Sequence, residues 1–373
     1  MFTQEFRASS PSNSTFEYTV GAFYSNQKTV QQPERFTISV RLPNGVVIRP
    51  VDSPGALNEI TDESLAVFGQ GTLHATDSLR VILGGRYTGG RLSLDRTDAG
   101  NGAKSFQILN VDRVSWRTGV QYDVAPSLMA YATASRGFKG GQIAVPTAPL
   151  LPYVVQPEVP MSYEGGVKAT LFGGAVLDFS QFYSKIKNFQ AQECIVNPIT
   201  AQLVCAQTNI DGVKTRGAEI NLFGRISDRP SLNTGFIYTK ATYPGGFIGN
   251  DGSNIGGKQL AYSPRYKFTL SGEYEQPLTS GLNGFLAADT IWKSRIGYQN
   301  TSRTEETFRP HWTVGGRVGV RSEDERYSAG LFVRNLFNVN EPSLLQSNFG
   351  SGLGVIYGPQ SFRQVGLQLD AKF

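Results

Sequence analysis

The sequence predicts an all-β chain that forms a transmembrane antiparallel β-barrel. Three observations support this fold class: polar and apolar residues alternate with a period of two, short turns alternate with long connections, and no apolar run is long enough for a membrane helix. Successive strand residues point to opposite faces of a sheet, so a period of two indicates a strand with one apolar and one polar face. A membrane helix needs about 18 consecutive apolar residues, whereas a barrel strand turns only every second residue to lipid.

The alternation defines the strands in order along the chain. In VDRVSWRTGVQYDV (111–124) the even positions from Val114 are mostly apolar, and the odd positions carry arginine, serine, glutamine and aspartate. Residues 164–172 and 218–226 alternate in the same way. Short turns at 125–127, 173–174 and 227–230 then lead into partner strands. These pairs predict antiparallel hairpins.

The last residues, 367–373, also alternate, with Leu367, Leu369, Ala371 and Phe373 on one face. A chain end frays unless it is held, so a terminal Phe predicts a strand fixed in a sheet. We expect the even face of this strand to look into the barrel lumen and the odd face to look at lipid.

Long connections rich in Gly, Pro, Asn and Ser lie at the other ends of the strands, near 26–60, 97–110, 138–160, 190–210, 244–260, 299–308 and 338–360. Compact soluble domains rarely carry several connections of this length, whereas outer-membrane barrels have short turns on one side and long loops on the other. The pattern predicts about 15 strands in one domain, residues 1–373, with no dividing linker. Soluble sandwiches, lipocalin-like barrels and propellers fit the strand number or spacing less well.

The formal net charge is +5, but no basic run is present and the Lys and Arg residues are scattered through the strand-like segments. We therefore expect lumenal and surface charge and no nucleic-acid partner.

Several segments resemble the C-terminal barrel portion of TonB-dependent outer-membrane receptors of the siderophore-receptor type. The similar segments are 115–141, 162–172, 179–190, RGAEINL (216–222), SPRYKFTLSGEYEQP (263–277), VRNLFNVN (333–340) and 357–373. Their order and spacing fit the family, and the resemblance covers nearly the whole chain. It implies location in the bacterial outer membrane, contact with outer-membrane lipid, and no enzymatic activity or cofactor.

The chain also departs from the family pattern. Complete members carry a signal peptide, a TonB-binding motif, a plug domain and a 22-stranded barrel. None of the first three is recognisable here, and residues 1–14 lack a basic and an apolar signal region. We expect an N-terminally truncated receptor, the C-terminal part of the barrel, that lacks roughly seven strands and does not close by itself.

Two motifs with possible chemistry do not support an enzyme. Residues 136–141 (RGFKGG) match neither a P-loop nor a dinucleotide-binding pattern, so we expect the start of a loop. His74 and His311 are the only histidines, and neither stands at a catalytic spacing from a nucleophile or carboxylate. We predict no catalytic residue and no metal site, and we expect His74 to end a strand.

Cys194 and Cys205 are the only cysteines and lie in one predicted extracellular connection. Two cysteines in such a loop favour a disulfide, worth roughly 3 kcal/mol in the chain-entropy model. A metal pair is the alternative, although no histidine lies nearby.

Ligand contacts in this family lie between the extracellular loops and the plug. Aromatic and cationic loop residues suit an anionic ferric catecholate or hydroxamate through stacking, cation–π contacts and charge. An oligosaccharide or another aromatic compound fits almost as well, and such residues also pack on each other. The candidates are Phe138, Lys139, Tyr153, Tyr243, Phe247, Tyr298, Arg303, Phe308, Phe349 and Tyr357.

Other aromatic residues are predicted to form the girdles at the membrane interfaces. They are Trp116, Tyr122, Trp292, Trp312 and Phe373.

The resemblance implies active import of a ferric siderophore or a similar large nutrient, energised by the TonB complex through the missing N-terminal region. A passive porin-like channel is an alternative, because porins have about 16–18 strands. A nonfunctional receptor fragment is the third hypothesis.

Overall fold

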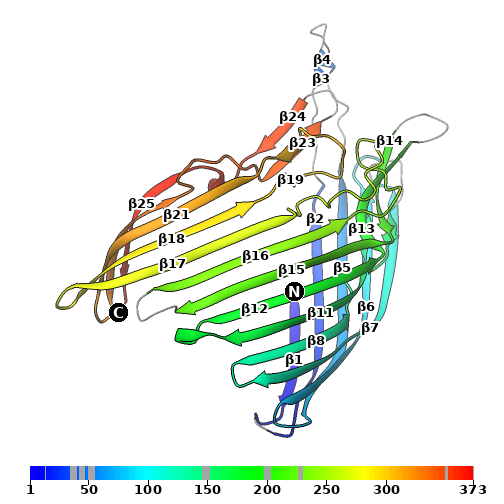
Figure 1. The fold of residues 1–373 in the computed structure, drawn as a ribbon. Helices are drawn as coiled ribbons and strands as arrows, with labels where there is room; N and C mark the ends of the chain where they lie inside the picture. Colours follow the sequence, from blue (N-terminus) through cyan, green and yellow to red (C-terminus); the bar gives the residue numbers. More distant parts are fainter. Residues whose placement is uncertain are drawn as a thin grey trace.

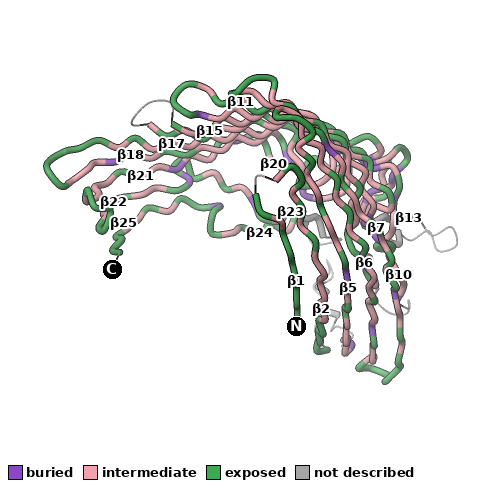
Figure 2. The backbone as a smooth tube through the Cα atoms, turned by 90° about the horizontal axis from the view of Figure 1, so that it is seen from below, coloured by how far each residue is buried: buried purple, intermediate pink, exposed green. Residues whose placement is uncertain are grey.

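The computed structural model of the chain describes residues 1–12, 14–33, 40–41, 47–48, 55–144, 152–196, 203–225, 230–348 and 352–372. Its main feature is one antiparallel sheet of 15 strands, which confirms the predicted fold class and strand number. Between the edge strands β1 and β25, each strand pairs with the members of this sheet that come before and after it in the chain. The sheet curves into an arch with β1 at one edge and β25 at the other (Figure 1, Figure 2).

The strands of the sheet alternate in direction along the chain. They are β1 (Phe2–Ser9), β2 (Phe16–Gln31), β5 (Ala56–His74), β6 (Leu79–Asp98), β7 (Lys104–Ala125), β8 (Leu128–Arg136), β11 (Val159–Thr170), β12 (Val176–Lys187), β15 (Val213–Arg225), β16 (Ser231–Thr242), β17 (Tyr266–Thr279), β18 (Leu282–Lys293), β21 (His311–Ser322), β22 (Tyr327–Arg334) and β25 (Gln364–Ala371).

Five small hairpins lie in the connections and belong to separate two-stranded sheets. They are β3 (Val40–Arg41) with β4 (Val47–Ile48), β9 (Gln142–Ala144) with β10 (Tyr153–Val155), β13 (Phe189–Val196) with β14 (Leu203–Ile210), β19 (Ile296–Gly297) with β20 (Thr307–Phe308), and β23 (Leu344–Asn348) with β24 (Gly352–Ile356). Two 3-10 turns, η1 (Phe172–Gly174) and η2 (Pro359–Ser361), complete the described elements. Within the described residues, no helix is long and apolar enough to cross a membrane.

Short turns and long connections lie at opposite ends of the sheet, as predicted, apart from one short turn between β6 and β7 at the loop end (Figure 1). The turn between β5 and β6 is typical of the short ones: the Thr76 hydroxyl accepts the N–H of Leu79 at 3.0 Å. His74 is the last residue of β5, which confirms its predicted place at a strand end.

The predicted long connection at 97–110 is wrong. β6 continues to Asp98 and β7 begins at Lys104, so only five residues connect them. Asp98 stabilises this turn, because its Oδ1 accepts the N–H of Gly100 at 2.9 Å, and Gly102 supplies a φ of +70°. The strand ends here are rich in polar residues and lack the apolar alternation of a lipid-facing strand. The sequence pattern alone therefore predicted a loop.

One face of the sheet exposes large apolar side chains; we call it the apolar face. Five of its residues form a row across five strands, through the pairs Tyr274–Leu286, Leu286–Val318, Val318–Leu331 and Leu331–Leu367. Between 41% and 62% of each of these residues is exposed. A folded protein leaves such a row uncovered where lipid covers it, so this is the face that a barrel turns to the membrane.

The opposite, polar face carries charge pairs. Arg321 contacts Glu275 at 2.7 Å and Glu273 at 3.3 Å, and Arg317 contacts Glu273 at 3.1 Å. Both guanidinium groups lie 5.1 Å from the ring centroid of Phe285. Charges matched in this way are typical of a barrel's lumenal face.

The last strand confirms the predicted alternation. Val365, Leu367 and Leu369 are exposed on the apolar face, whereas the Gln368 amide donates to the Asp370 carboxylate at 3.1 Å on the polar face. Phe373 lies outside the described residues. In the part of the chain that the structure describes, β25 pairs only with β22 and β1 only with β2, so the 15-stranded sheet has two unpaired edges.

Candidate functional site

The connections at the loop end of the sheet contact one another from β8 to β25. At the first contact, the Glu158 carboxylate accepts Lys139 Nζ at 3.1 Å and the Gln190 backbone N–H at 2.9 Å. The Gln190 side chain donates in turn to the carbonyl of Gly140 at 2.8 Å. The connections after β8 and after β12 are therefore held together by buried polar groups.

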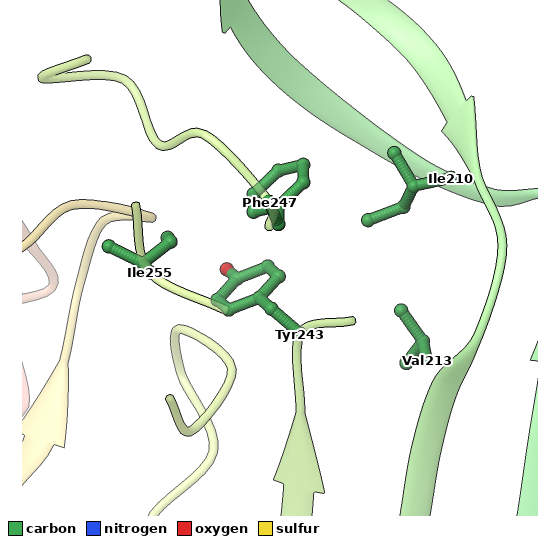
Figure 3. Packing of buried hydrophobic residues seen from close by; sticks show 5 residues of the cluster. All are labelled: Ile210, Val213, Tyr243, Phe247 and Ile255. Atoms are coloured by element: carbon green, nitrogen blue, oxygen red, sulfur yellow. The ribbon is translucent and has the colours of Figure 1, made fainter. Parts of the chain in front are cut away.

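An apolar cluster joins the connection after β12 to the connection after β16 (Figure 3). The rings of Tyr243 and Phe247 stack at 4.8 Å with an interplanar angle of 7°. Ile210, Val213 and Ile255 surround them, and at most 7% of any of these five residues is exposed. Burial of the Tyr243 ring raises the pKa of its phenol.

Polar contacts join the connection after β16 to the connection after β18. Asp251 Oδ2 accepts the backbone N–H of Ser302 at 2.9 Å and its hydroxyl at 2.8 Å, and Ser253 donates to the Oδ1 atom at 2.6 Å. Partial burial acts to raise the pKa of Asp251, but these hydrogen bonds outweigh it and lower the pKa to about 2. The carboxylate therefore stays charged at neutral pH and holds the two loops together.

A second buried cluster joins the last two long connections. Ile296, Tyr298 and Leu345 are buried together, and Phe308 packs against them. Beside them, the Glu341 carboxylate accepts Lys293 Nζ at 2.8 Å and lies 3.2 Å from His311 Nε2. Burial opposes the charge of Glu341, but these two partners lower its pKa to about 2, whereas burial and the adjacent Glu341 charge raise the pKa of Tyr298.

Between the connections after β16 and β18 lies a cavity of about 400 Å³. Its lining includes four cationic residues: Lys258, Arg265, Arg295 and Arg303. We call this cavity the basic loop pocket. Glu306 also lines it, but the carboxylate is buried and accepts a hydrogen bond from Thr301. Four cations around one cavity favour an anionic ligand.

Tyr262 lies next to pocket-lining residues in a strained conformation. Its φ is +56°, a value that bulky side chains rarely adopt. The backbone N–H donates to the Gly297 carbonyl at 2.7 Å, and the ring meets Tyr298 edge-on at 5.3 Å. Tyr262 remains 52% exposed, so it presents an aromatic surface beside the cations.

The structure separates the predicted ligand residues into buried and accessible ones. Tyr243, Phe247 and Tyr298 are buried at 7%, 2% and 3% exposure. Phe247 and Tyr298 therefore present no surface to a ligand, whereas Tyr243 contributes a small surface to the lining of the basic loop pocket. These three residues fit the alternative that aromatic loop residues pack against other parts of the protein. Arg303 lines the basic loop pocket, as a ligand contact requires.

Two further candidates have their polar groups engaged by the protein. Lys139 is paired with Glu158, and the Tyr153 hydroxyl donates to the Gln207 carbonyl at 2.6 Å. The prediction of a ligand contact at these positions therefore concerns the Lys139 stem and the Tyr153 ring.

The remaining candidates lie at separate places. Phe138 is half-buried after β8, and Phe308 meets the His311 ring edge-on at 5.0 Å. Tyr357 is 46% exposed and packs edge-on against Phe362. Phe349 lies outside the described residues. The structure brings these residues to the loop end without gathering them around one cavity.

Cys194 and Cys205 are direct cross-strand partners in the hairpin of β13 and β14. Directly opposed residues place their Cβ atoms about 4.5–5.5 Å apart, which suits a disulfide after a small adjustment. Their side chains lie outside the described residues, so the disulfide stays a prediction.

The described girdle candidates all lie on the apolar face. Trp292 and Trp312 are paired across β18 and β21, with ring centroids 6.3 Å apart, at the loop end. Trp116 and Tyr122 occupy even positions of β7, on the same face. This placement supports the predicted contact with membrane interfaces.

The sequence prediction missed several residues that hold or line the loops, among them Glu341, Asp251, Lys258, Arg265 and Arg295. The available signal was the set of cations that flank the connections at 244–260 and 299–308. Among the described residues, no three His, Cys, Asp or Glu side chains are grouped to hold a metal ion.

Comparison with known proteins agrees with this geometry. The family model described as TonB dependent receptor-like, beta-barrel, matches residues 2–336. The ferric-pyoverdine 358 receptor of Pseudomonas putida is 22% identical over 80% of this chain and 34% of its own length. The ferric-pyoverdine M114 receptor PbuA of Pseudomonas sp. strain M114 is 25% identical over 78% of this chain and 34% of its own length.

Solved structures show the same fold. The ferric yersiniabactin uptake receptor FyuA of Yersinia pestis has a TM-score of 0.78 and 20% identity, over 100% of this chain and 54% of that one. The ferripyoverdine receptor of the Pseudomonas aeruginosa outer membrane has a TM-score of 0.66 and 18% identity, over 100% of this chain and 48% of that one. This chain thus spans about a third of the length of the curated relatives and about half that of the solved receptors.

The match over residues 2–336, the 15-stranded sheet with its lipid-type face, and the contacting loops at one end establish that this chain belongs to the TonB-dependent receptor-like β-barrel family of the bacterial outer membrane, a family of transport proteins and not of enzymes.

Proposed function

We propose that this chain is the barrel part of a receptor that imports a ferric siderophore or a similar large anionic nutrient, with energy supplied through TonB. The basic loop pocket carries the proposal, because it gathers four cations at the loop end of a receptor-type barrel. Pyoverdine and yersiniabactin receptors among the similar proteins support the same ligand class. Four positive charges attract an anionic ligand more strongly than an oligosaccharide or another neutral organic ligand.

Uptake of radiolabelled iron tests the ligand class. A strain that lacks the gene is complemented with the full-length wild-type gene or with the triple variant R265Q/R295Q/R303Q, and single ferric siderophores are supplied in turn. We expect one siderophore to depend on the gene and its uptake to fall at least tenfold in the variant, because the loss of even one charge-assisted contact of about 1.5–3 kcal/mol weakens binding by about a factor of ten or more. The matched control K28Q/R91Q/K104Q removes three cations from β2, β6 and β7 and leaves uptake unchanged. Unchanged uptake of every siderophore in the deletion strain contradicts the proposal and favours an organic ligand.

The proposal also takes residues 1–373 as the C-terminal part of a 22-stranded barrel. The coverage of only 54% of the yersiniabactin receptor supports this. An antibody against β25 tests it on outer-membrane fractions of the native cell. A band well above the 40.7 kDa of this chain supports a complete, plugged receptor, whereas a band at that mass favours a fragment.

Conductance separates active transport from the passive channel. The full-length protein in a planar bilayer is expected to stay closed, because a plug fills a receptor of this kind. A large and constantly open pore contradicts active transport and supports the porin-like alternative.

A further inference from the structure

Five cations gather on the apolar face at the loop end of three neighbouring strands. Lys185 and Lys187 belong to β12, Lys214 and Arg216 to β15, and Lys240 to β16. We call them the outward basic patch. Strand alternation places all five on the same face as Phe179, Ile220 and Phe236, which are paired across these strands. The patch therefore lies on the face that the barrel turns to lipid.

The patch brings like charges together without compensation. Lys185 is the direct cross-strand partner of Lys214, and Arg216 is the direct partner of Lys240. Like charges directly opposite each other destabilise a sheet. No acidic residue occupies an apolar-face position along the described lengths of β11, β12, β15, β16 or β17, and none of the five cations forms an ion pair among the described residues. An external anion would relieve this repulsion.

The surroundings of the patch match a lipid headgroup region. Tyr183 is the direct partner of Arg216, and Tyr238 lies two residues before Lys240 on the same face. Small and apolar residues follow toward the turn end, as in the pairs Ala132–Gly165 and Val167–Phe179. Tyrosines at the boundary of an apolar band mark the level of lipid headgroups. Cations just beyond that level meet the phosphates of anionic lipids.

The opposite ends of the same strands lack such a patch. Their apolar-face positions hold Leu177, Leu222 and Leu232. The cations are thus confined to the loop end, which is the extracellular side of an outer-membrane barrel. The presence of cations at the loop end and not at the turn end fits a ligand that is found only in the outer leaflet.

We propose that the outward basic patch binds the phosphate groups of a phosphorylated glycolipid of the outer leaflet, with the acyl chains against the apolar band below. The lysine ammonium groups and the Arg216 guanidinium supply charge-assisted hydrogen bonds to phosphate oxygens, and the tyrosines lie beside the sugar. This site does not depend on which nutrient the receptor imports.

Binding of purified lipid A tests the proposal. The full-length receptor, purified in a neutral detergent and freed of lipid, is titrated with bisphosphorylated lipid A and with chemically dephosphorylated lipid A. We expect the wild-type protein to prefer the phosphorylated form at least tenfold. The variant R216Q/K240Q is expected to lose that preference. The matched control K28Q/R91Q removes two cations from the loop end of β2 and β6 and is expected to keep it.

Three outcomes overturn the proposal: equal affinity of wild-type protein for both lipid forms, an equal loss in R216Q/K240Q and K28Q/R91Q, or full competition by inorganic phosphate at the lipid concentration. The last outcome means a site for a soluble phosphate compound. Thermal unfolding in the same detergent confirms that each variant is folded. If R216Q/K240Q does not fold, K185Q/K214Q removes the other like-charged pair and gives the same test.

Discussion

Two regions at the loop end of the sheet are built in different ways. The strands β2, β5, β6 and β7 are 16, 19, 20 and 22 residues long, and a five-residue turn joins β6 to β7. We call the parts of these four strands at the loop end the strand extensions. From β12 onward the strands are at most 14 residues long, and their connections fold into the packed loops, held by buried side chains.

The two regions also treat charge differently. In the strand extensions, outward charges meet opposite charges, as in Lys28 with Glu59 at 2.7 Å. Around the packed loops, some charges form half-buried pairs, such as Lys293 with Glu341, and others form like-charged pairs in the outward basic patch. The strand extensions are stabilised by backbone hydrogen bonds between strands, which are spread over many residues. The stability of a packed loop depends on a few side chains. We therefore expect single substitutions to affect the packed loops far more than the strand extensions.

The largest effect is expected from Phe247→Ala in the packed loops. Loss of a buried phenylalanine costs about 3–5 kcal/mol, because its apolar contacts disappear and a cavity remains. Hydrogen exchange at the Ile255 amide, which donates to the Phe247 carbonyl, reports the local opening free energy. The control is Phe106→Ala in β7, where the ring is 51% exposed, and a small change is expected. Similar losses at both sites would contradict the comparison.

Acid is expected to open the packed loops before the strand extensions. The pKa of Glu341 falls from an ordinary 4.5 to about 2 in the folded chain, so its stabilisation is present above pH 4.5 and is lost as the pH falls toward 2. Pepsin digestion between pH 4.5 and 2 is expected to cut within 335–363 progressively faster. Glu341→Gln is the control: it weakens the cluster by about 2 kcal/mol at neutral pH and removes most of the pH dependence in this window. A variant with the wild-type pH profile assigns the effect to other groups.

Arg216→Glu is expected to stabilise the lipid-free protein. The substitution converts a like-charged cross-strand pair with Lys240 into an attractive one, worth about 1 kcal/mol. The unfolding midpoint in neutral detergent measures this gain, and added salt should reduce it. Arg216→Gln, which removes the repulsion without adding attraction, is expected to fall between the two. An unchanged or lower midpoint for Arg216→Glu shows that the patch carries no repulsion to relieve.

The smallest effect is expected from Glu59→Gln in the strand extension. The side chains of Lys28 and Glu59 are 57% and 40% exposed, and such surface pairs contribute little to stability. The unfolding midpoint of the full-length protein should remain within experimental error of the wild-type value. A clear loss means that the strand extensions also depend on single side chains, and the distinction between the two regions then fails.

The sequence predicted the strands better than the loops. The alternation in 111–124 and 367–373 gave the correct face for Trp116, Tyr122 and Leu369, because lipid imposes period two on every strand that it touches. The same reasoning failed at 97–110, where the strands continue beyond the apolar band and no face needs to be apolar. Of the ten predicted ligand residues, Arg303 and the largely buried Tyr243 line the basic loop pocket, whereas Phe247 and Tyr298 are buried away from it.

The strands, their two faces and the end of each strand that carries a loop could be predicted from the amino-acid sequence, since all three follow from local alternation and turn composition. Which loop residues contact one another depends on the folded arrangement of the chain. Lys293 and Glu341 are 48 positions apart, Asn300 and Gln192 are 108 apart, and each pair forms a hydrogen bond. No local pattern marks such partners, because the curvature of the sheet and the packing of neighbouring loops bring them together. The outward basic patch is a further example, because the register of three strands places its cations opposite one another.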